Sequence, residues 1–246
     1  MQQLMLKTKM AQATQAPFAF NVPDVDSLFP GFRRGDFSIV YGPKSLTSLI
    51  SQLCVRAQLE ESQGGLSSKV VFIDAASSSS LSSIMEAADF QQQKNGAVLE
   101  NLISMRAYTA YRLTSLIMEK LEETVALSNA KIVVISGIAG PFQSDNVDDQ
   151  EAKAVYSQIM SYLASLARKH KIIIVATYLP HEGSRRNNTL QEITNAKANV
   201  ILRFTKTPYT SEVELEKHPS YMLGVSEFNP EISVEEAAPT LCYRIL

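Results

Sequence analysis

Short apolar runs, each about as long as one β-strand, alternate along this chain with segments of helical periodicity. Six such runs are Phe37–Tyr41, Val70–Asp74, Leu102–Met105, Ile132–Ile135, Ile172–Ala176 and Val200–Phe204. Near-continuous apolar runs of this length are typical of strands that are buried on both faces of a parallel sheet. Because strands that alternate with helices form a mostly parallel sheet covered by helices on both faces, the sequence predicts an α/β fold.

The segments between these runs complete the expected organisation. A helical turn is expected at Asp24–Phe29, and helices are expected from about Ser48, over Leu81–Ala88, through Leu113, Leu116, Ile117, Leu121 and Val125, and through Val155, Ile159, Leu163 and Leu166. The last ~40 residues alternate more, which predicts short antiparallel strands at the C-terminal edge of the sheet. We therefore expect an N-terminal arm over residues 1–19 and a single core domain over residues 20–246.

Composition narrows the class of protein. Hydrophobic residues make up 45% of the 246 residues, which indicates a globular chain. The net charge is −2, so the overall charge does not attract nucleic acid. Two distant cysteines, Cys54 and Cys242, indicate a reducing compartment and follow no metal-ligand spacing. The apolar runs are too short for a membrane helix and the first ten residues lack a signal-type segment. We expect a cytoplasmic protein, nuclear in a eukaryote, without membrane contact.

The segment Gly42–Leu49 occupies the place of a phosphate-binding loop, between an expected strand and an expected helix. Such a loop reads G-x-x-x-x-G-K-[ST] and binds phosphate through backbone N–H groups, a lysine and a hydroxyl oxygen on magnesium. Gly42 fills the first glycine position. Thr47, Ser48 and Leu49 stand where the second glycine, the lysine and the magnesium ligand are required. The sequence therefore predicts a nucleotide-binding scaffold whose binding groups are replaced.

Two charged residues near this loop leave an alternative open. Lys44 would contact phosphate in a variant loop, and Asp74, at the end of an apolar run, would hold a metal. We favour an exposed turn lysine for Lys44, because without a second glycine the backbone cannot wrap a phosphate group. We favour a hydrogen-bond acceptor for Asp74, the usual role of a carboxylate where a buried strand ends.

The order of several segments resembles the core of the RecA-superfamily ATPases, and within it the RadA-type recombinases and their paralogs. These segments are FSIVYG with QLCVRAQL, VVFIDAASSSSLSSI, NLISMRAYTAYRLTSLIMEKLEE, KIVVISGIAGPFQSD and IIIVATYL. The third contains Arg106-Ala107-Tyr108, which is similar to an Arg-Ala-Tyr/Phe signature of the family. The resemblance covers about residues 20–230 and implies a RecA-like sheet.

The departures from the family pattern imply a loss of chemistry. In the family, an Asp that orders magnesium's water ends the fourth apolar strand, a catalytic Glu follows the second strand, and a polar sensor follows a later strand. The counterparts here are Ser136, Ala76 and Tyr178-Leu179. Phosphoryl transfer needs positioning, metal and an oriented water together. The resemblance therefore implies a pseudo-ATPase with no catalytic residue, no cofactor and no metal.

The family binds single-stranded DNA through two loops. The counterpart of the first loop, residues 143–151, carries four acidic side chains and no basic one: Asp145, Asp148, Asp149 and Glu151. This charge repels phosphate. The counterpart of the second loop, Pro180–Asn195, is polar and is expected to be mobile. Our DNA-binding candidates lie in it and just beyond it: Arg185, Arg186, Lys197 and Arg203. An ordinary solvated loop is the alternative, so only weak binding to single-stranded DNA is expected.

Two other features admit two interpretations each. RadA-type recombinases self-associate through an aromatic residue just before the core, and Phe18 and Phe20 lie in that region without the family's Phe-x-x-Ala pattern. They are interface candidates, and packing on the chain's own sheet edge is the alternative. The basic run Arg168–Lys171 suits the C-terminal dipole of an expected helix, with a role in nucleic-acid binding as the alternative.

Three functions follow from the resemblance. The first is a non-catalytic paralog that acts as an accessory or mediator in homologous recombination and DNA repair, with a RadA-type recombinase or another RecA-like paralog as partner. The second is a structural subunit of another assembly, as in Elongator accessory subunits or KaiC-like regulators. The third is a residual ATPase with a rearranged site that uses Lys44 and Asp74. Oligomerisation is left open.

Overall fold

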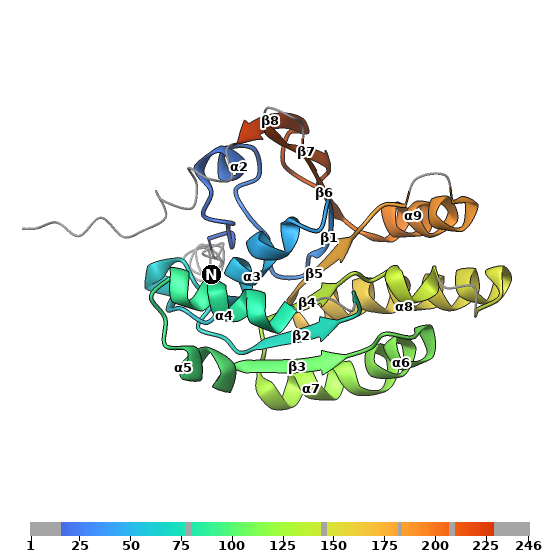
Figure 1. Ribbon diagram of the computed structural model, residues 1–246, viewed down its shortest axis with the longest axis horizontal. Coiled ribbons are helices and arrows are strands. Elements are labelled where there is room, and N and C mark those ends of the chain that lie inside the picture. The colour runs from blue at the N-terminus through green and yellow to red at the C-terminus, as the bar shows by residue number, and fades with distance from the viewer. Residues whose placement is uncertain (1–15, 77–79, 144–146, 182–183, 207–209, 229–246) are drawn as a thin grey trace, which may run out of the picture.

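A central β-sheet runs through the molecule, and helices cover both of its faces (Figure 1). The computed structural model describes residues 16–76, 80–143, 147–181, 184–206 and 210–228. Within these residues the sheet has eight strands, in the order β3-β2-β4-β5-β1-β6-β7-β8. The strands are β1 (Phe37–Tyr41), β2 (Val70–Asp74), β3 (Leu102–Arg106), β4 (Ile132–Ser136), β5 (Ile173–Tyr178), β6 (Val200–Lys206), β7 (Ser211–Lys217) and β8 (Gly224–Phe228).

The direction of the strands confirms the predicted fold class. Strands β3, β2, β4, β5, β1 and β6 are parallel to one another, while β7 pairs antiparallel with both β6 and β8 at the C-terminal end of the sheet. Every residue of β1, β2 and β4 is buried, which explains why these strands appear in the sequence as continuous apolar runs. This arrangement is consistent with a RecA-like α/β fold.

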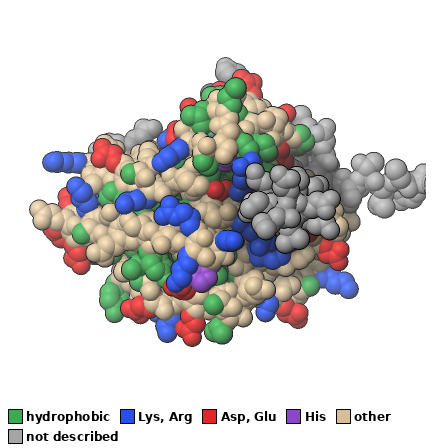
Figure 2. Space-filling view, turned by 180° about the vertical axis from the view of Figure 1, so that it is seen from behind, with side chains coloured by type: hydrophobic (Ala, Val, Ile, Leu, Met, Phe, Trp, Pro, Cys, Tyr) green, Lys and Arg blue, Asp and Glu red, His purple; other side chains and the backbone are tan. Residues whose placement is uncertain are grey.

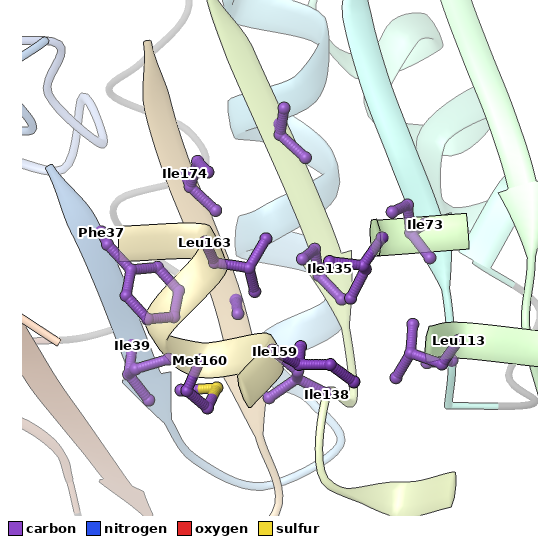
Figure 3. Packing of buried hydrophobic residues seen from close by; sticks show 14 of the residues in the cluster. Phe37, Ile39, Ile73, Leu113, Ile135, Ile138, Ile159, Met160, Leu163 and Ile174 are labelled. Atoms are coloured by element: carbon purple, nitrogen blue, oxygen red, sulfur yellow. The ribbon is translucent and has the colours of Figure 1, made fainter. Parts of the chain in front are cut away.

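The helices divide between the two faces of the sheet. They are α2 (Pro23–Leu28), α3 (Leu46–Arg56), α4 (Ser80–Phe90), α5 (Asn95–Glu100), α6 (Ala110–Ser115), α7 (Leu121–Ser128), α8 (Asp149–His170) and α9 (Arg185–Lys197), with the 3-10 turns η1 (Glu61–Gln63) and η3 (Gly140–Phe142). Helices α6, α7 and α8 share one apolar cluster with the sheet, in which Ile159, Met160 and Leu163 of α8 face Phe37 and Ile39 of β1 (Figure 3). Helices α3, α4 and α5 share the other cluster with the opposite face.

The helix expected through Leu113–Val125 is interrupted by a π-helical turn, η2 (Leu116–Lys120), between α6 and α7. Along the whole expected helix, the apolar residues Leu113, Ile117, Leu121 and Val125 recur at a spacing of four. An α-helix has about 3.6 residues per turn, so residues at this spacing drift around its axis. A wider π-turn compensates for the drift and keeps all four side chains buried on one face.

The N-terminal segment is integrated into the fold from Phe18 onward. Phe18 and Phe32 exchange two backbone hydrogen bonds, of 2.8 and 2.9 Å. The side chains of Phe18 and Phe20 are each only 2% exposed, and the Phe20 ring contacts those of Phe29, Phe32 and Phe204. In this structure, both rings therefore pack on the chain's own fold, which was the alternative interpretation. Contact with a partner through either ring would require this segment to leave the core. The core begins at Phe18, two residues before the predicted boundary at residue 20. Most of the predicted arm lies outside the described residues, and so do residues 229–246.

Among the helices of the described residues, none is both long enough and apolar enough to cross a membrane.

Candidate nucleotide site

The carboxyl ends of the parallel strands bring the predicted site residues together. Asp74 at the end of β2 is paired in register with Arg106 of β3 and Ser136 of β4. Beside them, the loop after β1 borders a cavity of about 190 Å³. The predicted residues that line it are Gly42, Lys44, Thr47, Ala76 and Ser136, together with Tyr178 and Leu179. The fold therefore places the residues at the ends of the second and fourth apolar runs beside the loop that follows β1.

The loop is short because helix α3 begins at Leu46, two residues before the expected start. Ser45, the residue that precedes the helix, already has helical dihedral angles (φ −60°, ψ −20°). The backbone N–H groups of Leu46, Thr47 and Ser48 donate to the carbonyl oxygens of residues 43, 44 and 45 over 3.0, 3.0 and 3.3 Å. A helix N-terminus binds phosphate through N–H groups that have no partner in the helix. Here three of these donors are occupied within the loop itself.

Side chains also fill the space above the loop. A methyl group placed on Gly42 would lie 3.1 Å from Leu46 Cδ2 and 3.2 Å from Phe204 Cβ, so the first glycine faces apolar atoms. Ser48 and Leu49, at the positions of the family's lysine and magnesium ligand, line a second cavity of about 140 Å³ with Phe228. Ser48 therefore does not join the other predicted site residues, because the early start of α3 turns it toward β6 and β8.

The first cavity contains one charged group among its described lining residues, the exposed Lys44. Asp74 is 4% exposed and does not line the cavity; its Oδ1 accepts a hydrogen bond from the Ala76 N–H at 3.2 Å, and its Oδ2 accepts one from the Tyr108 hydroxyl at 3.5 Å. This is the acceptor role expected for Asp74. Carboxylate oxygens are preferred magnesium ligands, and no lining side chain carries one. Across the described residues, no group of three His, Cys, Asp or Glu side chains could hold a metal ion.

A close backbone approach leaves little room at the position of the catalytic glutamate. Gly137 has a φ of +68°, and a Cβ atom built on it would lie 2.7 Å from the Cβ of Ala76. The Gly137 N–H donates to Thr177 Oγ1 at 2.8 Å, which fixes this turn to β5. Glycine is therefore required at position 137 for two reasons: a side chain would clash with Ala76, and the positive φ disfavours other residues.

A cluster of buried tyrosines that sequence reasoning missed lies under α9. The Tyr178 hydroxyl donates to Asn187 Oδ1 at 2.8 Å, and the same oxygen accepts from Gln143 Nε2 at 3.0 Å. The Tyr156 hydroxyl is 2.8 Å from Thr194 Oγ1, and the Tyr41 hydroxyl donates to Asn195 at 2.7 Å. Burial raises the pKa of each tyrosine, so all three stay neutral.

Helix α9 occupies most of the segment that was expected to be a mobile loop. Its sequence signals were present: Ser184 accepts from the Asn187 N–H as an N-cap, and Leu190 and Ile193 recur at helical spacing. The side chain of Asn187 is 2% exposed, because its amide is used by Tyr178 and Gln143. The sequence around Asn187 does not indicate that its side chain has buried hydrogen-bond partners. The role of Asn187 was therefore not predicted.

The four DNA-binding candidates differ in their surroundings. Arg186 forms an ion pair with Asp149 and donates to the Val147 carbonyl at 2.9 Å. Arg203 forms an ion pair with Glu216, and its guanidinium lies 4.6 Å from the centre of the Tyr41 ring. Arg185 and Lys197 are exposed at the two ends of α9, about 18 Å apart along the helix. The structure therefore does not bring the four together as one surface.

The acidic residues of the first loop serve the start of α8. Asp148 caps this helix by accepting from the N–H groups of Gln150 and Glu151, and Asp149 pairs with Arg186. Negative charge is favourable at a helix N-terminus. Asp145 lies outside the described residues.

Comparison with known proteins assigns the fold to a family. The Rad51 family model matches residues 22–192. Over 140 residues, or 56% of the chain, the sequence is 30% identical to "DNA repair protein RAD51 homolog B" of Zea mays. Over 152 residues, or 53% of the chain, it is 28% identical to "DNA repair protein RAD51 homolog 3" of Cricetulus griseus. It is 26% identical over 137 residues, or 55% of the chain, to "DNA repair and recombination protein RadA" of Metallosphaera sedula. The matches span only 41–42% of these relatives' lengths. The chain belongs to the Rad51 family.

Proposed function

We propose that this chain is a non-catalytic member of the Rad51 family that acts as an accessory or mediator protein in homologous recombination and DNA repair. Its partner would be a RadA-type recombinase or another RecA-like paralog, with at most weak contact to single-stranded DNA. One observation carries the proposal: the N–H groups of Leu46, Thr47 and Ser48, which a phosphate loop would offer to a nucleotide, are hydrogen-bonded to the loop's own carbonyl oxygens.

The chemistry of the cavity supports the same proposal. A triphosphate with its magnesium ion needs several cations, and the metal is usually held by one or two carboxylates besides the phosphates. Apart from hydroxyl groups, the described lining offers the single charge of Lys44, and Asp74 is directed to Ala76 and Tyr108 instead. These residues do not fit a magnesium–triphosphate, which supports a role in contact with other macromolecules.

The names of the relatives support recombination and repair as the process. The three named above carry the words DNA repair, and one of them also carries recombination. A member of this family without phosphoryl-transfer groups would act by binding a partner that retains them, and by changing that partner's assembly on DNA.

The direct test mixes the purified chain with the RadA-type recombinase of the same cell. We expect co-elution in size-exclusion chromatography and a change in the rate of strand exchange. Bovine serum albumin at the same concentration controls for nonspecific crowding. Separate elution together with an unchanged strand-exchange rate would contradict the proposed partner.

A second prediction addresses the residual-ATPase alternative. Magnesium-dependent ATP hydrolysis is expected to stay at the buffer background for the unaltered chain and for Lys44→Ala alike. The melting temperature is also expected to be unchanged by magnesium and ATP, whereas saturation at about 100 times Kd would add about 2.7 kcal/mol to the stability of the folded state. Turnover that disappears in Lys44→Ala would establish the alternative.

A further inference from the structure

Cations from four separate segments gather where the parallel strands begin, at the end of the sheet opposite to the candidate nucleotide site. The turn before β1 provides Arg33 and Arg34, and Lys69 and Lys131 directly precede β2 and β4. The last turn of α8 and the residue after it provide the rest. We call this set the basic edge: Arg33, Arg34, Lys69, Lys131, Arg168, Lys169 and Lys171.

Backbone contacts show that the four segments are adjacent. The Gly35 N–H donates to the Ile172 carbonyl at 2.9 Å, which places the Arg33–Arg34 turn beside Lys171. The Ile173 N–H donates to the Lys131 carbonyl at 2.9 Å. The Lys131 N–H donates to Ser68 Oγ at 2.7 Å, and this brings Lys69 to the same place. The basic edge is therefore one continuous surface of the fold.

Two glutamates neutralise some of the charge on this surface. Glu61 lies 3.1 Å from Lys131 Nζ and 3.9 Å from Arg34. Glu122 lies 2.7 Å from Lys169 Nζ and 2.8 Å from His170 Nε2, and hydrogen bonds from these two side chains lower the pKa of Glu122 to about 2. Lys69, Arg168 and Lys171 are exposed, and no ion pair engages their side chains among the residues that the structure describes. Positive charge therefore remains on the surface.

The dipole of α8 does not explain the whole set. Cations are favourable at a helix C-terminus, and this accounts for Arg168, Lys169 and Lys171. Arg33, Arg34 and Lys69 belong to other segments and lie at no α-helix C-terminus, while Lys131 is the second residue after the C-cap of α7, Asn129. Figure 2 shows one face of the molecule, on which Lys and Arg side chains gather across the middle. Charge of one sign drawn from several elements indicates an extended anionic partner.

We propose that the basic edge binds the phosphate backbone of double-stranded DNA. The exposed large hydrophobic side chains of the described residues all lie outside these four segments, and the nearby Tyr221 ring is covered by the Arg33 guanidinium at 4.7 Å. The four segments therefore present cations and not the rings that stack on single-stranded bases or the apolar core of a protein interface. What it offers is separated cations on an exposed edge, which suit the regularly spaced phosphates of a duplex. This site lies at the opposite end of the parallel strands from the nucleotide cavity.

The test compares two variants with equal charge changes. The first removes three cations of the basic edge: Arg34→Gln, Arg168→Gln and Lys171→Asn. Asparagine suits position 171 because Lys171 has a φ of +51°, a conformation that asparagine tolerates. The second removes three exposed cations elsewhere and serves as the control: Arg112→Gln, Lys120→Gln and Lys153→Gln. Circular dichroism establishes that both variants are folded.

Fluorescence anisotropy with a labelled duplex of random sequence measures binding over a salt series. For the unaltered chain, affinity is expected to fall as salt rises, because each phosphate contact releases counterions. The first variant is expected to lose at least about tenfold in affinity and to flatten the salt slope by about 2–3, while the control stays within about twofold.

Three outcomes would overturn the proposal. The first is equal binding of the duplex by both variants. The second is a clear preference for a single-stranded oligonucleotide that is lost in the first variant. The third is binding of poly-glutamate but not of the duplex, which would identify an acidic protein segment as the occupant. None of these outcomes bears on co-elution with a recombinase, so the two proposals fail separately.

Discussion

Phe29→Ala is expected to lower the free energy of unfolding by about 3–5 kcal/mol. The Phe29 side chain is fully buried, and its ring centre lies 4.9–6.2 Å from those of Phe20, Phe32, His218 and Tyr221. It therefore joins the N-terminal segment to the turn between β7 and β8. Truncation removes apolar burial and leaves a cavity that the surrounding rings cannot fill, and urea denaturation measures the loss.

Phe90→Ala is the matched control for this prediction. The same atoms are removed, but Phe90 is 39% exposed at the end of α4. We expect a loss below about 1 kcal/mol, because less apolar area returns to water and no closed cavity forms. Equal losses for the two variants would show that the aromatic cluster around Phe29 does not hold the N-terminal segment.

Asn187→Ala is expected to cost about 2–4 kcal/mol, although a smaller side chain is removed. The Asn187 amide oxygen accepts from both the Tyr178 hydroxyl and Gln143. Without it, the buried Tyr178 hydroxyl keeps only the longer bond of 3.2 Å to the backbone carbonyl of residue 187, and Gln143 Nε2 loses this acceptor; a weakened or lost partner of a buried polar group costs about 1–3 kcal/mol. Urea denaturation measures the cost, and hydrogen exchange in α9 is expected to accelerate because this contact fixes the helix to β5.

Two further variants isolate the buried hydrogen bond. Asn188→Ala changes the exposed neighbour in the same helix and is expected to alter stability by less than about 0.5 kcal/mol. Tyr178→Phe combined with Asn187→Ala is expected to cost less than the sum of the two single changes, since the partner left unpaired by one change is absent in the double variant. Strict additivity would mean that the two residues do not interact.

Strands β1, β2 and β4 could be predicted from the sequence because each of them is buried along its whole length. In β1, β2 and β4 this burial appears directly as an apolar run, so the expected range matches the strand within one residue. The site residues at the ends of β2 and β4 followed from these ranges, because the ends of parallel strands lie at one edge of a sheet. The apolar runs placed the ends of these strands at one edge, and the resemblance to the RecA superfamily singled out Ala76 and Ser136 there.

The features that the sequence did not reveal depend on contacts between distant residues. Helix α9 was interpreted as a loop because its exposed polar residues obscure the spacing of Leu190 and Ile193. The burial of Asn187 depends on Tyr178 and on Gln143, and Gln143 is 44 residues away. The early start of α3 depends on carbonyl groups that no side-chain pattern reports. Residue identity predicts a degenerate loop, whereas only geometry shows that the amides of Leu46, Thr47 and Ser48 are occupied.

The self-bonded start of α3 has a consequence for the lifetime of any complex. In a nucleotide-driven switch, hydrolysis changes the bound ligand and thereby the contacts that this ligand holds. Under the proposed role, a subunit whose loop amides are satisfied by its own carbonyl oxygens would not undergo this change. Under the proposed role, it would leave an assembly only through dilution or through the nucleotide cycle of its partner.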